Sequence, residues 1–313
     1  GPAFIEKSAN IPVAVKRIMD SKTFDNGTIC ASEQSIITER CIEQKVVDEV
    51  SRQGGYFMTP EESEKLSKFI LRANGTMNPK IVGKSAQTLA DMAGIRIPAG
   101  TRVLVSRQRT VGKDNPYSRE KLCPILAFYV EDGWEEACRR SIEILNNEGA
   151  GHTMTIHSED ADVIREFALQ KPVSRLLVNT PGALGGVGAT TGLQPALTLG
   201  CGSVGGSATS DNVSPLNLIN RRRVAWGLCE LEDLRKQQEQ MTGTSAASQS
   251  TIGSGSSCGQ NAGFGSNGVF SSGADSGAAC GSSNSGAACS PEITEDDIAR
   301  ITKAVLQKLG ALN

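Results

Sequence analysis

The sequence predicts an α/β fold in which helices cover a parallel sheet. Short apolar runs, typical of buried strands, alternate with segments of about 10–15 residues in which apolar side chains recur at helical spacing. This alternation favours parallel pairing, because a crossover helix returns the chain to the same edge of the sheet. The pattern stops at Met241, so the α/β domain is expected in the residues before it.

The N-terminal residues predict two successive strand–helix units. The apolar run Pro2–Ile5 predicts a strand, and a helix is expected from Asn10 onward. Ser35–Thr38 predicts a buried strand. The helix that follows is expected to end at Gly54–Gly55, because glycine suits the left-handed conformation that closes many helices.

A capping box predicts the start of the next helix. Thr59 is the expected N-cap, Pro60 suits the first helical position, and the Glu62 side chain can return to the cap backbone. The elements expected after it are strands at Arg102–Ser106, Ile125–Val130, Met154–His157 and Leu176–Val178, and helices at Trp134–Leu145 and Asp160–Leu169.

Charge and cysteine usage exclude several classes of function. The 313 residues carry 32 Lys and Arg against 34 Asp and Glu, so no basic footprint for nucleic acid or an anionic membrane is present. Nine cysteines without a C-x-x-C pair and only two histidines give no zinc spacing, and they suit a reducing cytoplasm. No apolar run approaches the ~18 residues of a membrane helix.

The C-terminal part changes composition twice. From Met241 to Ser290 the chain consists mainly of Gly, Ser, Ala, Thr and Asn, which predicts a flexible, disordered linker. Thr294 then begins a short amphipathic helix that Gly310 can end, with an apolar face formed by Ile298, Ile301, Val305 and Leu309. A tethered amphipathic helix is typical of a docking segment, although it can also fold back on its own domain.

Cys30 has the surroundings expected of a nucleophile. It closes the run Phe24–Cys30, which contains a glycine turn, and small and polar residues follow it. A reactive cysteine needs an exposed sulfur and a lowered thiol pKa, because the thiolate is the nucleophile. The alternative, a buried and inert thiol, is the commoner state of free cysteines.

Four motifs in order resemble the CoA-acylating aldehyde dehydrogenases, the branch of the aldehyde dehydrogenase superfamily that releases acyl-CoA. They are Phe24–Ser35, Glu120–Phe128, Gly151–Thr153, and the pair formed by Asn179–Pro181 and Leu197–Ser203. The resemblance covers about residues 1–228 and implies an aldehyde dehydrogenase-type catalytic domain.

The resemblance assigns roles to individual residues. It implies that Cys30 is the catalytic nucleophile, that His152 takes a proton from the thiol of coenzyme A, and that Glu120, with Phe128, binds the NAD cofactor. An unshifted imidazole pKa suits the role of His152. The residues assigned to the substrate pocket are Asn26, Thr28, Ile29, Pro181 and Gly182.

The resemblance also divides the chain. It implies a remnant of the nucleotide-binding domain at 1–27 and a catalytic domain at 28–228, in which Leu216–Trp226 resembles the strand through which family members oligomerise. A polar helical extension at 229–240 and the linker at 241–290 follow. Residues 291–313 are similar to the encapsulation peptides that dock such enzymes on the shell protein of bacterial microcompartments, with 294–310 as the contact.

The expected function is NAD-dependent oxidation of acetaldehyde or propionaldehyde to acyl-CoA inside a cytoplasmic microcompartment. Two alternatives remain open from the residues alone. One is a non-catalytic cargo or scaffold piece, since the family's main nucleotide-binding domain precedes the nucleophile by far more than the twenty-nine residues present here. The other is acyl transfer by Cys30 without NAD.

Overall fold

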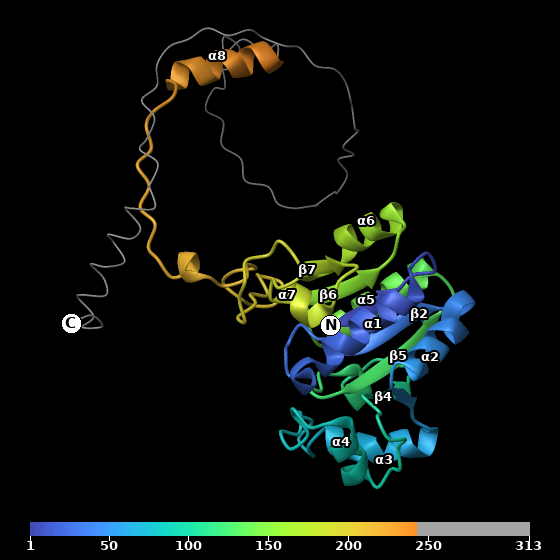
Figure 1. Ribbon diagram of the computed structural model, residues 1–313. Helices are drawn as coiled ribbons and strands as arrows, with labels where there is room; N and C mark the ends of the chain where they lie inside the picture. Colours follow the sequence, from blue (N-terminus) through green and yellow to red (C-terminus); the bar gives the residue numbers. More distant parts are fainter. Residues whose placement is uncertain (243–313) are drawn as a thin grey trace, which may run out of the picture. The chain divides into compact units, whose positions relative to one another are not determined.

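The computed structural model describes residues 1–242 (Figure 1). Residues 1–225 form one compact unit, and a second unit begins at Trp226. The predicted linker beyond residue 242 and the predicted encapsulation peptide at 291–313 lie outside the described residues.

A seven-stranded, wholly parallel sheet forms the centre of the first unit, in the order β3-β4-β5-β2-β1-β6-β7. This confirms the predicted α/β class. The strands are β1 Pro2–Ile5, β2 Ser35–Glu39, β3 Gly55–Phe57, β4 Val103–Arg107, β5 Ile125–Glu131, β6 Gly151–His157 and β7 Val173–Val178. The sequence did not predict β3, which is only three residues long and directly follows the glycine pair.

Helices cover both faces of the sheet, as Figure 1 shows. The helices are α1 Ile11–Thr23, α2 Glu43–Arg52, α3 Pro60–Ile70, α4 Ala86–Ala93, α5 Trp134–Asn147, α6 Ala161–Gln170 and α7 Gly182–Gly186. Alternate strand residues point to opposite faces. Ala3 and Ile5 therefore pack in the core under α1 and α2, while Phe4 packs in the core under α3 to α6.

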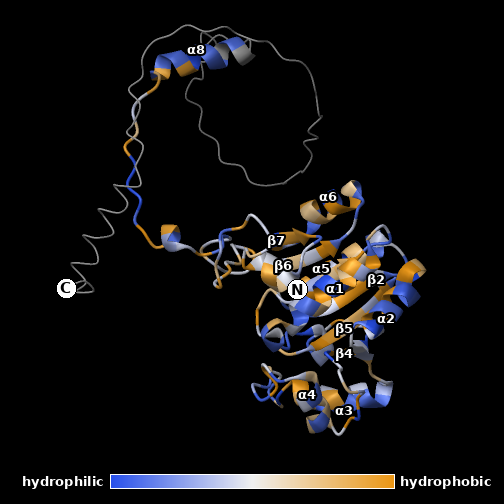
Figure 2. Cartoon of the chain, viewed as in Figure 1, coloured by the Kyte–Doolittle hydropathy of each residue, from blue (hydrophilic) through white to orange (hydrophobic). Residues whose placement is uncertain are grey.

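Local signals account for where several helices begin. The Asn10 side chain accepts a hydrogen bond from the Val13 amide at the start of α1, and the capping box of Thr59 and Glu62 opens α3 as predicted. Asp160 caps α6 in the same way. Figure 2 shows largely apolar strands and helices that combine apolar and polar residues, as a helix-covered sheet requires.

The predicted strand at Leu216–Trp226 is absent from the described chain. A short 3₁₀ turn occupies Pro215–Asn217, and residues 218–230 have no regular secondary structure. A strand exists only through pairing, and this stretch has no pairing partner within residues 1–242. In the second unit, α8 spans Leu231–Thr242, where the polar helical extension is predicted. No helix of the described residues is long and apolar enough to span a membrane.

Candidate active site

The candidate site lies at the amino edge of four adjacent strands. Cys30 is in the loop that leads into β2, and Glu120 is in the loop that leads into β5, the neighbour of β2. On the other side of β2 lies β1, which starts at Pro2 after Gly1, and then β6, where His152 is the second residue. Because parallel strands all begin at one edge, residues far apart in the sequence converge there.

A cavity of about 210 Å³ brings the three predicted reactive residues together. Cys30, Glu120 and His152 all line it. The other lining residues, which the sequence did not single out, are Gly1, Gln34, Ser118, Arg119, Ile144, Glu148, Gly149, Ala150 and Cys201. Within residues 1–242, no group of three or more His, Cys, Asp or Glu side chains is arranged to hold a metal ion.

Cys30 is only partly buried, and it follows a tight irregular turn. Asp25 and Asn26 have positive φ angles of 46° and 49°, and Gly27 continues the turn at 77°. Burial raises the pKa of the Cys30 thiol, and the nearby Glu120 carboxylate raises it further, whereas the backbone amides of Cys30 and Ala31 act in the opposite direction. The expected lowering of the pKa is therefore wrong for the described chain, whose resting thiol is protonated at neutral pH.

His152 is held by its neighbour and is neutral. Its Nδ1 lies 2.9 Å from the Thr153 hydroxyl. Burial, with a smaller contribution from Arg175, lowers the pKa of His152 to about 4. The expectation of an unshifted imidazole is thus corrected: the ring is uncharged at neutral pH and can accept a proton, but it is a weaker base than a free histidine.

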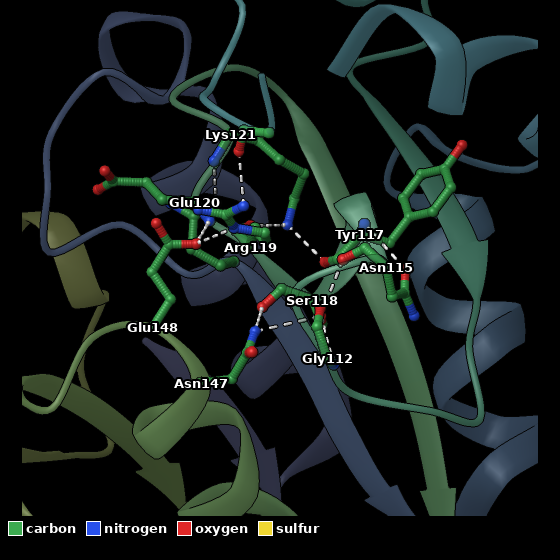
Figure 3. Close-up of polar contacts among 11 residues, drawn as sticks. Gly112, Asn115, Tyr117, Ser118, Arg119, Glu120, Lys121, Asn147 and Glu148 are labelled. Carbon is green, nitrogen blue, oxygen red and sulfur yellow. Dashed lines mark hydrogen bonds and ion pairs between the residues drawn. The ribbon is translucent and has the colours of Figure 1, made fainter. Parts of the chain in front are cut away.

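A carboxylate clamp, formed by Glu148 on Arg119 and Glu120, fixes the loop before β5 (Figure 3). Glu148 Oε2 accepts hydrogen bonds from Arg119 Nε and from the backbone amide of Glu120, both at 3.0 Å. Arg119 also donates to the Gly75 carbonyl at 2.7 Å. Glu148 is the C-cap residue of α5, where the loop that leads to His152 begins. The clamp therefore connects the loop that carries Glu120 with the loop that leads to His152.

We expect Glu148→Ala to accelerate alkylation of Cys30. Without the clamp the Glu120 carboxylate is no longer held beside the sulfur, and the thiol pKa should fall. The measurement is the pH dependence of iodoacetamide labelling of the Cys30 peptide, followed by mass spectrometry. Glu148→Gln is the matched control, because its amide oxygen can still accept from Glu120. An unchanged profile in Glu148→Ala, alongside a shifted one in Glu120→Gln, would contradict this role.

Beneath the cavity lies a buried polar cluster that the sequence did not reveal. Gln34 Oε1 accepts hydrogen bonds from the backbone amide of Lys121 at 3.1 Å and from Lys22 Nζ at 3.4 Å. The backbone amide of Gln34 donates to the Gly1 carbonyl at 2.9 Å. Lys121 Nζ donates to the Tyr117 and Arg119 carbonyls, both at 2.7 Å (Figure 3). Burial lowers the pKa of Lys22 to about 8 and that of Lys121 to about 7.

The buried lysines predict a stability that rises with pH. In the unfolded chain Lys121 keeps its ordinary pKa of 10.5, whereas in the folded chain it has a pKa of about 7. The unfolded state therefore binds more protons in this interval, and the free energy of unfolding should rise by about 2 kcal/mol between about pH 7 and about pH 8.5. Urea unfolding at several pH values measures this slope.

Lys121→Met should flatten the slope, and Lys113→Met, at an exposed lysine, should leave it unchanged. The variants should be compared below about pH 9. Burial raises the pKa of Cys123 to about 11, so above about pH 9 the titration of this thiol lowers the free energy of unfolding as the pH rises. A wild-type stability that does not change between neutral and mildly alkaline pH would contradict the prediction.

The structure does not place Phe128 with the reactive residues. Phe128 lies in the middle of β5, about 13 Å along the strand direction from the loop that carries Glu120. It lines a different pocket with Arg40, Arg107 and Arg140, beyond the carboxyl end of the strands. Phe128 is therefore not part of the cavity that Cys30, Glu120 and His152 line, and its assignment to the cofactor site stays a prediction.

The residues assigned to the substrate pocket do not line the cavity. Asn26 is exposed, while Thr28 and Ile29 precede Cys30 and are partly buried. Gly182 follows Pro181 and starts α7, where its amide donates to Glu33 Oε1 at 2.8 Å. A Cβ on Gly182 would lie 2.7 Å from that oxygen, so only glycine fits. The assignment of these residues to the acyl pocket stays a prediction.

The fold and the cavity define an α/β domain with a cysteine at the amino edge of its sheet, and comparison with known proteins connects this domain to acylating aldehyde dehydrogenases. No protein-family model matches the chain. It is 41% identical over 229 residues to the aldehyde-alcohol dehydrogenase of Clostridium acetobutylicum, which covers 72% of this chain and 26% of that protein. It is 36% identical to the acetylating succinate-semialdehyde dehydrogenase of Clostridium kluyveri, over 71% of this chain and 49% of that protein.

Solved structures give the same result. The probable aldehyde dehydrogenase of Listeria monocytogenes EGD-e is 65% identical with a TM-score of 0.72, over 75% of this chain and 52% of that one. The acetylating aldehyde dehydrogenase of Geobacillus thermoglucosidasius is 49% identical with a TM-score of 0.71, over 74% of this chain and 51% of that one. The homologues of this chain are thus acylating aldehyde dehydrogenases, and the chain spans about half of their length or less.

More distant structures carry informative ligands. The propionaldehyde dehydrogenase of Rhodopseudomonas palustris, at 25–26% identity and a TM-score of 0.60, has been solved with propionyl-CoA, and also with CoA and an acylated cysteine. A propionaldehyde dehydrogenase of the fucose utilisation microcompartment of Clostridium phytofermentans is 26% identical, with the same TM-score, over 67% of this chain and 47% of that one.

Proposed function

We propose that this chain is the thiol-bearing part of an NAD-dependent, CoA-acylating aldehyde dehydrogenase that acts on acetaldehyde or propionaldehyde. The observation that carries the proposal is the convergence of Cys30, Glu120 and His152 on one cavity, although 122 residues separate the first from the last. The acylating homologues and the acylated cysteine of a distant relative support the same chemistry.

Cys30 performs the covalent steps. Its thiolate attacks the aldehyde carbon and forms a thiohemiacetal, and loss of hydride from that carbon leaves a thioester on Cys30. Coenzyme A then displaces the acyl group and returns the thiolate. Burial and the Glu120 carboxylate raise the pKa of the Cys30 thiol, so Cys30 has to lose its proton before it attacks the aldehyde.

Glu120 is suited to hold the nicotinamide ribose. Glu120 lines the cavity, and within the described residues its carboxylate accepts no hydrogen bond, whereas Oε2 of the neighbouring Glu148 accepts two in the clamp. A free carboxylate can accept both ribose hydroxyl protons. Bound NAD supplies the hydride acceptor.

His152 is suited to accept the proton of the CoA thiol. The neutral ring lines the same cavity as Cys30, and Thr153 fixes its Nδ1 side. Cys201, from the last of the four family motifs, also lines the cavity.

The test is an assay of the full-length gene product that contains this chain, with propionaldehyde, CoA and NAD. We expect NADH formation that requires CoA. A folded protein that forms no NADH with either aldehyde would overturn the proposal and favour a scaffold function. CoA-dependent ester cleavage without NADH formation would instead favour acyl transfer alone.

We further propose that residues 294–310 dock the enzyme on a microcompartment shell protein. The amphipathic pattern of this segment and the microcompartment origin of the Clostridium phytofermentans relative support the idea. Deleting residues 291–313 should leave the activity unchanged and abolish co-purification with shell protein. Unchanged co-purification would refute the docking role.

A further inference from the structure

A buried cysteine and a buried lysine face each other between α5 and the end of α6. Lys171 Nζ lies 2.5 Å from Cys138 Sγ, and both residues are less than a tenth exposed. Lys171 is the C-cap residue of α6, and its Nζ also lies 3.9 Å from the ring centroid of Phe167. Within the described residues no carboxylate pairs with Lys171, so the thiol is its closest polar partner.

We propose that Cys138 and Lys171 form an oxidative modification site in which a sulfur–nitrogen bond joins the two side chains. Desolvation of an ammonium group is costly unless the group is paired, and Lys171 has no carboxylate partner among the described residues. Beside a thiol, however, an amine is a built-in nucleophile for any oxidised form of the sulfur.

The reaction needs one equivalent of a peroxide. Hydrogen peroxide oxidises the thiol to sulfenic acid and is itself reduced, with loss of one water. The amine lone pair of Lys171 then attacks the sulfur, the S–O bond breaks, and a second water leaves, which gives a sulfenamide. Two equivalents of a small thiol reverse the step: they restore the cysteine and the amine and become a disulfide.

The environment favours this product over further oxidation. Burial lowers the pKa of Lys171, so a larger fraction of the amine is unprotonated and nucleophilic than for an exposed lysine. The same burial keeps out bulky thiols that would otherwise capture the sulfenic acid. Gln170 Oε1, 3.5 Å from the sulfur, accepts the thiol hydrogen and orients the sulfur toward the amine.

Peptide mapping of the chain treated with hydrogen peroxide tests the proposal. We expect a linked pair of peptides, one with Cys138 and one with Lys171, whose mass is two hydrogens below the sum of the parts, and we expect dithiothreitol to release them. Lys171→Arg should abolish the link, because guanidinium is a poor nucleophile, while Cys41→Ser, at an exposed cysteine, should leave it intact.

Three results would overturn the assignment. Cys138 oxidised to sulfinic acid without a linked peptide would show that the amine does not capture the sulfur. A link that persists in Lys171→Arg would identify another partner, and a linked pair that retains an oxygen atom would exclude the direct bond. If Lys171→Arg fails to fold, Cys138→Ser serves as the second variant. None of these readouts depends on dehydrogenase activity, so this proposal and the proposed function can fail separately.

Discussion

Replacing Cys30 by serine is expected to abolish acyl-CoA formation, with a loss of about three orders of magnitude or more. The variant keeps the size of the side chain but replaces a thiol by a hydroxyl, which ionises far less readily and cannot form the thioester. The measurement is NADH formation from propionaldehyde and CoA by the full-length gene product, with its unfolding midpoint as the check on folding.

Two additions make the Cys30 experiment decisive. Cys41→Ser changes an exposed cysteine away from the cavity and should retain activity. Labelling by an activated ester, followed at the Cys30 peptide, detects acylation without any cofactor. Activity of Cys30→Ser within tenfold of the wild type, an interval of about 1.4 kcal/mol in barrier height, would rule out this residue as the nucleophile.

The sequence was sufficient for most of the fold because its signals are local. The capping box at Thr59 and the periodic apolar residues of α1 and α5 act within a few residues of where they are read. The missed elements have weaker signals. β3 is three residues long, and α4, although capped by Ser85 and closed by Gly94 at φ 64°, has only eight residues.

For the candidate active site, the sequence predicted only those residues to which a family motif assigns a role. Cys30, Glu120 and His152 were found through family motifs, and the structure brings them to one cavity. Gln34 lies within the motif Phe24–Ser35, but the motif assigned it no role, and Glu148 lies outside all four motifs, because a glutamate after a helix is an ordinary surface residue until the fold pairs it. The pKa shifts of Cys30 and His152 likewise depend on burial, which no local pattern encodes.

Replacing Phe167 by alanine is expected to cause the largest loss of stability among simple core variants. The side chain is fully buried, and its ring stacks on Phe4 of the central strand β1 with 5.0 Å between centroids and 7° between planes. Removing a buried phenylalanine ring costs about 3–5 kcal/mol, because the lost transfer energy adds to that of the cavity left behind. The free energy of unfolding in urea measures the loss.

The comparison variant is Phe24→Ala, at a phenylalanine that is 45% exposed, which should change stability by no more than about 0.5 kcal/mol. Because Lys171 lies over the Phe167 ring, the variant should also loosen the lysine beside Cys138 and reduce the yield of the peroxide-induced link. A Phe167→Ala protein that loses less than about 1 kcal/mol would mean that α6 does not pack on the sheet as described. The stacked pair would then contribute no more than a surface contact.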